Sequence, residues 1–350
     1  MSTFFNSVHI TNFKSLKDVT LSDCRRINLL IGKPNVGKSN ILEALGLFGV
    51  GYSRLNKNKK LTQFVRFNNI RELFFDGDTT QPIVIELNNN DRGSNVPSCR
   101  VDYQASKQRD LFGSFVLNNE QLLITLLFSD GKHSKLTVNS KLNIDITELG
   151  GLYDIKQYKF IHNSALENLN IPYLIPPFGT NLLNVIQEYK QLQKELRDIF
   201  SEYNLKLVID TGNHELRIQK EIKDGLVFSL PYDSIADTLQ RIIFFKAAIA
   251  SNEDSILLFE EPEAHCFPPY ITHIAKEIIS SETNQFFIAT HSPYILDTFL
   301  ENRRDDLAIF MADFKDGQTV IKRLTDGELN DVYEYGLDLF FNSELFTDEL

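Results

Sequence analysis

The chain has 350 residues and a formal net charge of −11; 42% of its residues are hydrophobic and 24% are charged. This balance is typical of a globular protein with one large or two medium cores, and it argues against a disordered chain or a wholly basic nucleic-acid binder. The three cysteines (Cys24, Cys99 and Cys266) lack metal-ligand spacing, the apolar runs are too short for a membrane helix, and the first residues do not resemble a secretion signal, so a cytoplasmic protein is expected.

Two short strands are expected near the start of the chain. Apolar and polar residues alternate over residues 8–13, and apolar residues recur over residues 16–21. A turn around Lys14 and Ser15 would join the two strands. An apolar run at residues 27–31 then predicts the strand that leads into the most informative motif of the sequence.

Residues 32–39, Gly-Lys-Pro-Asn-Val-Gly-Lys-Ser, match the pattern GxxxxGK[S/T] and precede a helix-like segment at residues 40–45. A glycine-rich turn of this kind lets successive backbone N–H groups surround a phosphate, and the helix adds the positive end of its dipole. Lys38 is expected to reach the β and γ phosphates of a nucleotide, and Ser39 to take one Mg²⁺ position.

A β-rich block is expected in the middle of the first half. Residues 49–80 are rich in Asn, Gly and Asp and predict irregular structure, although the basic patch at residues 54–60 could contact phosphates of DNA. Beyond them, short turns between strand-like runs predict an antiparallel β layer against the nucleotide-binding sheet. The strand-like runs are residues 82–87, 99–103, 122–128 and 136–138.

The pattern then changes to helical periodicity. Apolar residues spaced three and four apart over residues 182–203 predict one continuous amphipathic helix, which either packs on its own domain or protrudes as a partner-binding helix or short coiled coil. Three strands are expected between residues 205 and 230. A helix over residues 235–250 follows, and Ser234 and Asp237 have the spacing of a capping-box variant. Its N-terminal N–H groups form either a second anion site or simply a capped, buried helix end.

Two further strand ends carry candidate catalytic residues. Residues 255–263, Ser-Ile-Leu-Leu-Phe-Glu-Glu-Pro-Glu, predict a strand buried on both faces with two acids at its carboxyl end. Glu260 could hold Mg²⁺ and Glu261 could polarise the attacking water, and a nearby cation would relieve the repulsion between them. His291 follows a second buried strand, in residues 284–293, where it is expected to contact the γ-phosphate.

With these motifs the chain resembles an ATPase of the ABC type, in the branch that contains RecF, the structural-maintenance-of-chromosomes (SMC) proteins and the overcoming-lysogenization-defect (OLD) family. Residues 10–15 match the family's start, residues 257–263 its Walker B motif and residues 289–293 its histidine switch. The resemblance implies catalytic and switch roles for Glu261 and His291, and a place near the nucleotide for Lys14. It assigns the Walker A motif, and with it nucleotide binding, to Gly32, Pro34, Asn35, Val36, Gly37, Lys38, Ser39 and Asn40.

The fold class that follows from the resemblance is α/β: an ABC-ATPase-like P-loop domain with a mixed central sheet, an antiparallel β layer and a helical lobe. We expect a single domain over residues 1–350. Its parts would be an N-terminal lobe with Walker A and the β layer (1–175), a helical, signature-like lobe (176–250), and a part with Walker B, the histidine switch and the C-terminal tail (251–350). ATP and Mg²⁺ are the implied cofactors, and two ATP molecules would be trapped between the subunits of a head-to-tail homodimer.

The sequence departs from the family pattern at three places. Glu260 stands where Walker B usually has Asp, although members of this branch also use Glu. The Ser-x-Gly of the ABC signature is absent from residues 234–241, where Ser234, Asp237 or Thr238 could still face the opposite ATP. A Q-loop glutamine is not recognisable, although residues 173–181 occupy roughly that place.

The expected function is that of an ATP-dependent switch or sensor. The 59 residues after His291 read as a strand, a hairpin at Lys315-Asp316-Gly317 and an acidic tail, too little for the Toprim domain of OLD-like nucleases. Any nuclease or toxin activity is therefore expected from a separate effector protein, in antiphage defence. The alternatives are a RecF-like repair ATPase that clamps DNA directly and a scaffold that binds ATP without hydrolysing it; no membrane partner is expected.

Overall fold

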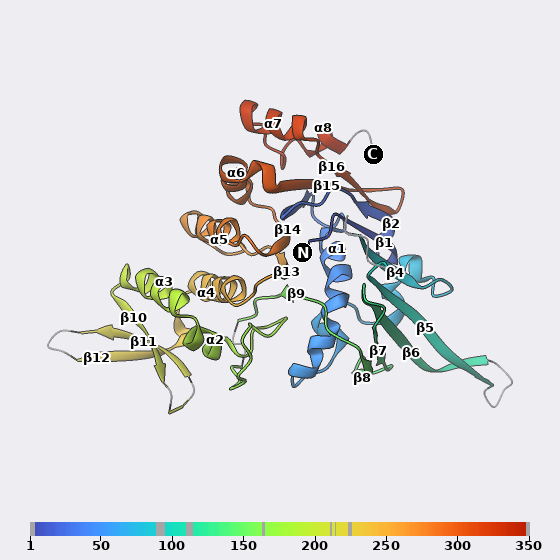
Figure 1. The fold of residues 1–350 in the computed structure, drawn as a ribbon, viewed down its shortest axis with the longest axis horizontal. Coiled ribbons are helices and arrows are strands. Elements are labelled where there is room, and N and C mark those ends of the chain that lie inside the picture. Colours follow the sequence, from blue (N-terminus) through green and yellow to red (C-terminus); the bar gives the residue numbers. More distant parts are fainter. Residues whose placement is uncertain are drawn as a thin grey trace.

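A six-stranded mixed sheet forms the centre of the computed structural model, which describes residues 4–88, 95–109, 115–162, 165–210, 212–213, 215–222 and 226–347. Its strand order is β16-β15-β3-β14-β13-β9 (Figure 1). All neighbours are parallel except β15 and β16, which form the hairpin expected around Asp316. The strands are β3 (Ile27–Gly32), β9 (Ile155–Tyr158), β13 (Ile256–Glu260), β14 (Gln285–Ala289), β15 (Leu307–Lys315) and β16 (Gln318–Arg323).

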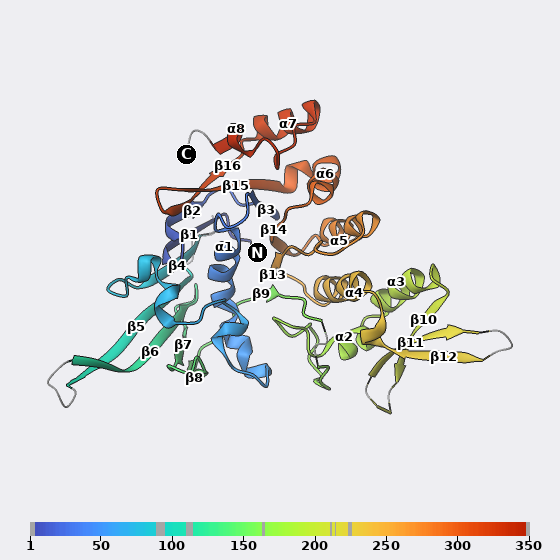
Figure 2. The same ribbon diagram turned by 180° about the vertical axis from the view of Figure 1, so that it is seen from behind.

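A seven-stranded antiparallel sheet lies beside the central sheet, with α1 (Lys38–Gly46) packed between them (Figure 2). Its order is β2-β1-β4-β5-β6-β7-β8, which confirms the expected hairpin of residues 8–21 and the β layer. Residues 47–77 form four short 3-10 helices where irregular structure was expected. The strands are β1 (Ser7–Phe13), β2 (Leu16–Leu21), β4 (Ile83–Asn88), β5 (Ser98–Arg109), β6 (Phe115–Leu127), β7 (His133–Val138) and β8 (Ile144–Leu149).

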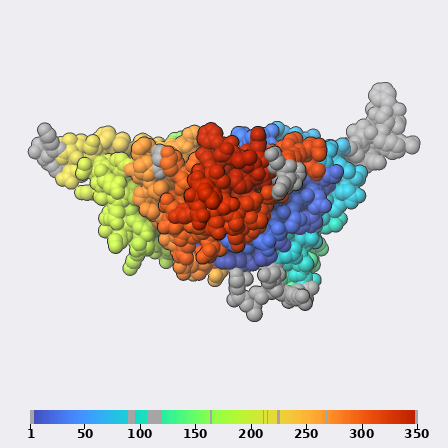
Figure 3. Space-filling model, turned by 90° about the horizontal axis from the view of Figure 1, so that it is seen from above, coloured from blue at the N-terminus to red at the C-terminus, as the bar shows by residue number. Residues whose placement is uncertain are grey.

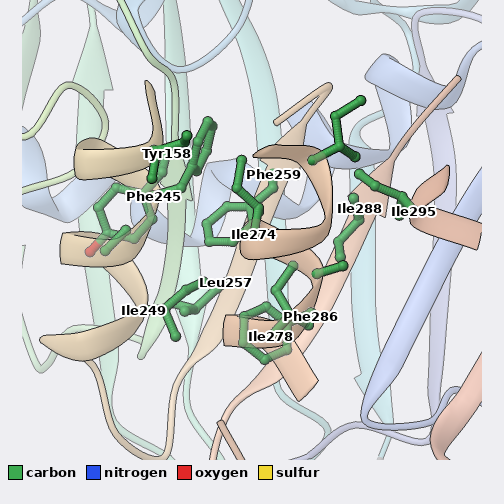
Figure 4. Close-up of a cluster of buried hydrophobic side chains, with 14 of the residues drawn as sticks. Tyr158, Phe245, Ile249, Leu257, Phe259, Ile274, Ile278, Phe286, Ile288 and Ile295 are labelled. Carbon is green, nitrogen blue, oxygen red and sulfur yellow. The ribbon is translucent and has the colours of Figure 1, made fainter. Parts of the chain in front are cut away.

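Helices cover the other face of the central sheet. Figure 4 shows side chains of α4 (Asp237–Ala250), α5 (Pro268–Ser280) and α6 (Pro293–Asn302) meeting the aromatic and aliphatic residues of β13 and β14. Alternate residues of β13 join different cores: Leu257 and Phe259 face these helices, while Ile256 and Leu258 face α1. Because both faces of β13 are covered, its run of apolar residues forms a central strand, as its sequence predicts.

The prediction of one helix over residues 182–203 is wrong. The chain forms α2 (Leu182–Glu188) and α3 (Lys190–Ser201), separated by Tyr189, whose ψ is 96°. Gln193 Nε2 donates to the carbonyl oxygens of Ile186 and Gln187, both at 2.8 Å, and so satisfies carbonyls that a continuous helix would have used. Both helices bury their apolar faces in the core, which agrees with packing on their own domain rather than with a protruding coiled coil.

The capping box expected at the start of α4 is also wrong. This helix begins at Asp237 after Ala236, which provides no side-chain cap, while Ser234 ends a separate 3-10 turn. Asp237 instead accepts a hydrogen bond from Arg241 Nε at 2.9 Å, one helical turn away.

A small sheet next to α3 and two helices after β16 complete the fold (Figure 1). A three-stranded antiparallel sheet of β10 (Leu205–Asp210), β11 (Glu215–Glu221) and β12 (Val227–Pro231) packs against α3. After β16 the chain forms α7 (Asp326–Tyr335) and α8 (Ser343–Thr347) in the stretch expected to be an acidic tail. Within the residue ranges given above, no helix is both long and apolar enough to cross a membrane.

Candidate nucleotide-binding site

The phosphate-loop motif forms the tight turn between β3 and α1. Gly37, just before α1, has φ 103°, a backbone conformation that side chains with a Cβ rarely adopt. A Cβ on Gly37 would also overlap with Thr319 Oγ1 and lie 2.8 Å from Ser15 Oγ. A Cβ on Gly32 would overlap with the carbonyl oxygen of Ala312. Both glycines are therefore required by the close approach of β15 and β16 to the loop.

The side chain of Lys38 forms hydrogen bonds to the backbone of the phosphate loop. Its Nζ donates to the carbonyl oxygens of Gly32 at 2.7 Å and Lys33 at 2.8 Å, and the residue is 6% exposed. Burial lowers the pKa of Lys38 to about 8, although the charges of Glu261 and Glu260 oppose this shift. An ammonium group that already bridges the loop is in position to exchange those carbonyl oxygens for phosphate oxygens.

The two acids of Walker B lie at the carboxyl end of β13. Because β3, β14 and β13 are parallel neighbours, this end lies on the same sheet edge as the phosphate loop and the end of β14. Glu261 has φ 43°, and its N–H donates to the carbonyl oxygen of Ala289 at 2.8 Å. Its side chain is 50% exposed, so its carboxylate is available to a water or ligand.

His291 stands beside this acid, with its Nε2 3.7 Å from Glu261 Oε1. Its backbone N–H donates to Glu263 Oε1 at 3.0 Å, and Thr290 Oγ1 donates to the same oxygen at 2.6 Å. Burial raises the pKa of Glu263, whereas burial and the charge of Lys38 lower the pKa of His291. Glu263 thus fixes the turn that presents His291, a positioning role that the sequence pattern did not reveal.

A second group of charges surrounds Glu260. Arg66 donates from Nη2 to Glu260 Oε1 at 2.7 Å and from Nε to Glu43 Oε1 at 2.8 Å. Lys14 forms an ion pair with Glu43 and donates to the carbonyl oxygen of Arg66 at 2.7 Å. Sequence reasoning missed Arg66; its only sequence signal is the acid Glu43 within the apolar part of α1, which needs a cationic partner when buried.

Lys159 is another cation that sequence reasoning missed. It follows β9, the neighbour of β13, and its Nζ donates to the carbonyl oxygen of Phe64 at 2.6 Å. Burial lowers the pKa of Lys159 to about 8, and the charges of Glu43 and Glu260 oppose that shift.

The expected trans residues lie in the 3-10 turn before α4, in the case of Ser234, and in the first turn of α4, in the case of Asp237 and Thr238. Thr238 Oγ1 donates to the carbonyl oxygen of His265 at 2.9 Å, Asp237 pairs with Arg241, and Ser234 is exposed. Among the contacts of the described residues, none joins these three to the phosphate loop of the same chain.

The donor set suits a magnesium nucleotide. The loop, the ammonium group of Lys38 and the N-terminus of α1 provide positive potential for phosphate oxygens. The hydroxyl of Ser39 and the carboxylate of Glu260 are hard oxygen donors of the kind that Mg²⁺ takes beside nucleotide oxygens and water. Within the described part of the chain, no cluster of three or more His, Cys, Asp or Glu could hold a metal ion.

Comparisons with known proteins point to an ATPase family. The family model described as "AAA domain, putative AbiEii toxin, Type IV TA system" matches residues 27–297. An "ATP/GTP phosphatase" from Helicobacter pylori (strain ATCC 700392 / 26695) is 25% identical over 386 residues, covering 97% of this chain and 98% of the relative. RecF, "DNA replication and repair protein", from Clostridium botulinum (strain Loch Maree / Type A3) is 25% identical over 238 residues, 63% of each protein.

Among solved structures, an SMC head bound to the C-winged helix domain of ScpA has a TM-score of 0.51 and 14% identity. The match covers 92% of this chain and 98% of the SMC head. This likeness supports the fold class expected from the sequence, with its phosphate loop, mixed central sheet, antiparallel layer and covering helices.

Proposed function

Because the chain belongs to this AAA-domain family, as an ABC-type ATPase of the RecF/SMC branch, we propose that it binds ATP with Mg²⁺ at the phosphate loop and hydrolyses it to ADP and phosphate. The observation that carries the proposal is the convergence of Lys38, Glu261 and His291 at one edge of the central sheet. The resemblance of the whole chain to an ATP/GTP phosphatase supports hydrolysis as well as binding.

In this proposal each residue of the site has a separate role. Lys38 and the loop N–H groups would hold the phosphates, and Ser39 and Glu260 would hold Mg²⁺, which would supply positive charge beside the phosphates. Glu261 accepts a proton from the attacking water, for which its exposed carboxylate is suited. His291, held by Glu263 through its backbone, contacts the γ-phosphate from the end of β14.

The test compares two single substitutions. Lys38→Ala is expected to lose ATP affinity because it removes a phosphate contact, and this is measured by titration with a fluorescent ATP analogue. Glu261→Gln is expected to bind ATP normally but to turn over at least about 100-fold more slowly, because its positioned base is lost. Unchanged binding in Lys38→Ala would contradict the phosphate-loop assignment, and near-normal turnover in Glu261→Gln would contradict the catalytic one.

ATP also assembles the protein into a head-to-tail homodimer under this proposal. The support is that Glu261, His291 and the loop residues Pro34 and Asn35 are exposed or partly exposed, so one side of the site is open to a second subunit. The start of α4, with Ser234, Asp237 and Thr238, is the surface that would meet the ATP of the other subunit. Lys14, which lies in the turn between β1 and β2 and pairs with Glu43, would lie near the nucleotide.

The ATP cycle would control a separate effector in antiphage defence. The family's description names a toxin–antitoxin system, which is a two-component arrangement, but it assigns the toxin to the AAA-domain family itself and names no separate effector. A RecF-like clamp on DNA is the second candidate. It is favoured by the RecF relatives and by the exposed basic residues Arg54, Lys57, Lys59 and Lys60.

Native mass spectrometry of Glu261→Gln, purified from its own host with ATP and Mg²⁺, distinguishes these candidates. A nucleotide-loaded dimer that carries a second protein supports the effector hypothesis. A dimer that carries only nucleic acid, with salt-sensitive DNA binding, supports the clamp instead. A monomer without nucleotide would contradict both.

A further inference from the structure

Thr319 connects the C-terminal hairpin to the phosphate loop. It lies in β16, is 2% exposed, and its Oγ1 donates to the carbonyl oxygen of Val36 at 2.9 Å. Its N–H donates to the carbonyl oxygen of Ser15 at 2.8 Å, and its Oγ1 lies 2.6 Å from Ser15 Oγ. Figure 3 shows the C-terminal elements, in red, at the surface beside N-terminal residues drawn in blue.

Counting protons fixes the direction of these hydrogen bonds. A hydroxyl has one proton, and Thr319 gives its proton to Val36, so Ser15 must donate to Thr319. Ser15 Oγ in turn accepts from Asn40 Nδ2 at 2.8 Å. The result is a single chain of donors that starts on α1 at Asn40, passes through Ser15 and Thr319, and ends on the phosphate loop at Val36. Hydrogen bonds in such a chain polarise and so strengthen one another, and the last of them, from Thr319 to Val36, is buried.

The end of this chain sets the orientation of one peptide group. In a trans peptide the C=O and the next N–H point in opposite directions, so holding the Val36 carbonyl on Thr319 turns the Gly37 N–H away from the hairpin. The N–H groups of a phosphate loop are its ligands for phosphate oxygens. The two hydroxyls lie so close to Gly37 that a side chain at this position would not fit between them and the loop. The contact between the loop and the hydroxyls is therefore close as well as directional.

We propose that Thr319 is a positioning residue for nucleotide binding: through the chain of hydroxyls it holds the Val36–Gly37 peptide in the orientation that a phosphate requires. This inference rests on the proposed binding of ATP at the loop. It makes the C-terminal hairpin part of the nucleotide site, although its residues are about 280 positions from the loop in sequence.

A second contact between the C-terminal segment and the loop is of a different kind. Lys33 Nζ lies 2.7 Å from Glu344 Oε1, but these side chains are 57% and 75% exposed. Exposed ion pairs contribute little, so the buried hydroxyl of Thr319 is the contact that matters.

The test uses Thr319→Val, which keeps the shape but removes the hydroxyl, and Thr319→Ser, which keeps the hydroxyl. Loss of one buried hydrogen bond is expected to raise the Kd for a fluorescent ATP analogue about fivefold to tenfold in Thr319→Val. Thr319→Ser should stay near the wild-type Kd. At saturating ATP, kcat should change little in both, because the hydroxyl acts on binding rather than on the attacking water.

Thr298→Val is the matched control. Thr298 is also buried, at 8% exposed, and its Oγ1 donates to a backbone carbonyl, that of Tyr294, at 2.7 Å, but on α6. Its substitution should leave the Kd unchanged, and thermal melting of every variant verifies folding.

A wild-type Kd in Thr319→Val, or an equal loss of affinity in Thr319→Ser or Thr298→Val, would overturn the inference. Failure of the wild-type protein itself to bind the analogue would instead overturn the proposed function. The two failures are therefore distinguishable.

Discussion

At the scale of single residues, the charged side chains around the site form a network of ion pairs. Glu43 has no exposed side-chain surface, yet it pairs with both Lys14 and Arg66. Arg66 continues the network to Glu260, so the Walker B acid and the helix that follows the phosphate loop share one cation. A buried carboxylate of this kind is costly without its partners, and breaking the pairing should destabilise the protein.

Glu43→Gln tests this network. We expect the substitution to lower the free energy of unfolding by about 3 kcal/mol, because Lys14 and Arg66 lose the charge between them. Glu344→Gln, which removes the exposed partner of Lys33, should leave it nearly unchanged. Chemical denaturation of both variants measures the difference. Equal effects would show that the network around Glu43 adds nothing beyond an exposed pair.

We predict that Lys38 makes ATP affinity depend on pH. Burial lowers its pKa to about 8 in the free protein, and a bound triphosphate favours the charged form, so binding must take up a proton above that pH. The affinity should therefore fall as the pH rises past the pKa, approaching about tenfold for each further pH unit. Titrations of a fluorescent ATP analogue across this range measure the slope.

Lys38→Arg is the control for that pH dependence, because a guanidinium group stays charged throughout. Its affinity should be nearly independent of pH in the same range. Lys159, whose pKa is also lowered to about 8, remains in this variant. A slope as steep as that of the wild-type protein would therefore assign the dependence to another group such as Lys159.

At the scale of elements, the sequence predicts those that local patterns determine. The phosphate loop, the hairpin of β1 and β2, the antiparallel layer and the buried strand β13 all follow from periodicity and turn residues. The break at Tyr189 does not, because the spacing of apolar residues continues through it while Gln193 binds the carbonyls of the preceding helix. Such patterns do not predict the contacts of Arg66 with Glu260 and of Thr319 with Val36, since these partners lie 194 and 283 residues apart in sequence.

The packing of the hairpin on the loop gives a prediction at this scale. Gly37 and Gly317 both have positive φ, at 103° and 79°, but only Gly37 has neighbours where a Cβ would stand. Gly37→Ala should abolish measurable ATP binding, because the loop must move away from Thr319. Gly317→Ala, at the hairpin tip, should cost only the backbone penalty of about 1 kcal/mol and keep ATP affinity. Similar affinities in the two variants would show that the loop tolerates the overlap.

At the scale of the whole molecule, the central sheet separates two cores. Helices cover one face, and α1 with the antiparallel sheet covers the other. The residues proposed to bind the nucleotide lie at the edge formed by the carboxyl ends of β3, β13 and β14. There the loop, Glu261 and His291 belong to one group, while Ser234, just before α4, and Thr238, in its first turn, have no described contact to that loop. Such a division is what a site completed by a second subunit requires.

Mixing inactive variants tests whether the two groups complement each other between subunits. In a head-to-tail dimer, Lys38→Ala paired with the double variant Ser234→Ala/Thr238→Ala leaves one composite site intact, because the loop of one subunit meets α4 of the other. Equal amounts should therefore recover about one quarter of wild-type ATP hydrolysis, since half of the dimers are mixed and each has one working site. Lys38→Ala mixed with Glu261→Gln should recover nothing, because both substitutions affect the same half of a site. Recovery in that second mixture, or none in the first, would contradict the head-to-tail dimer.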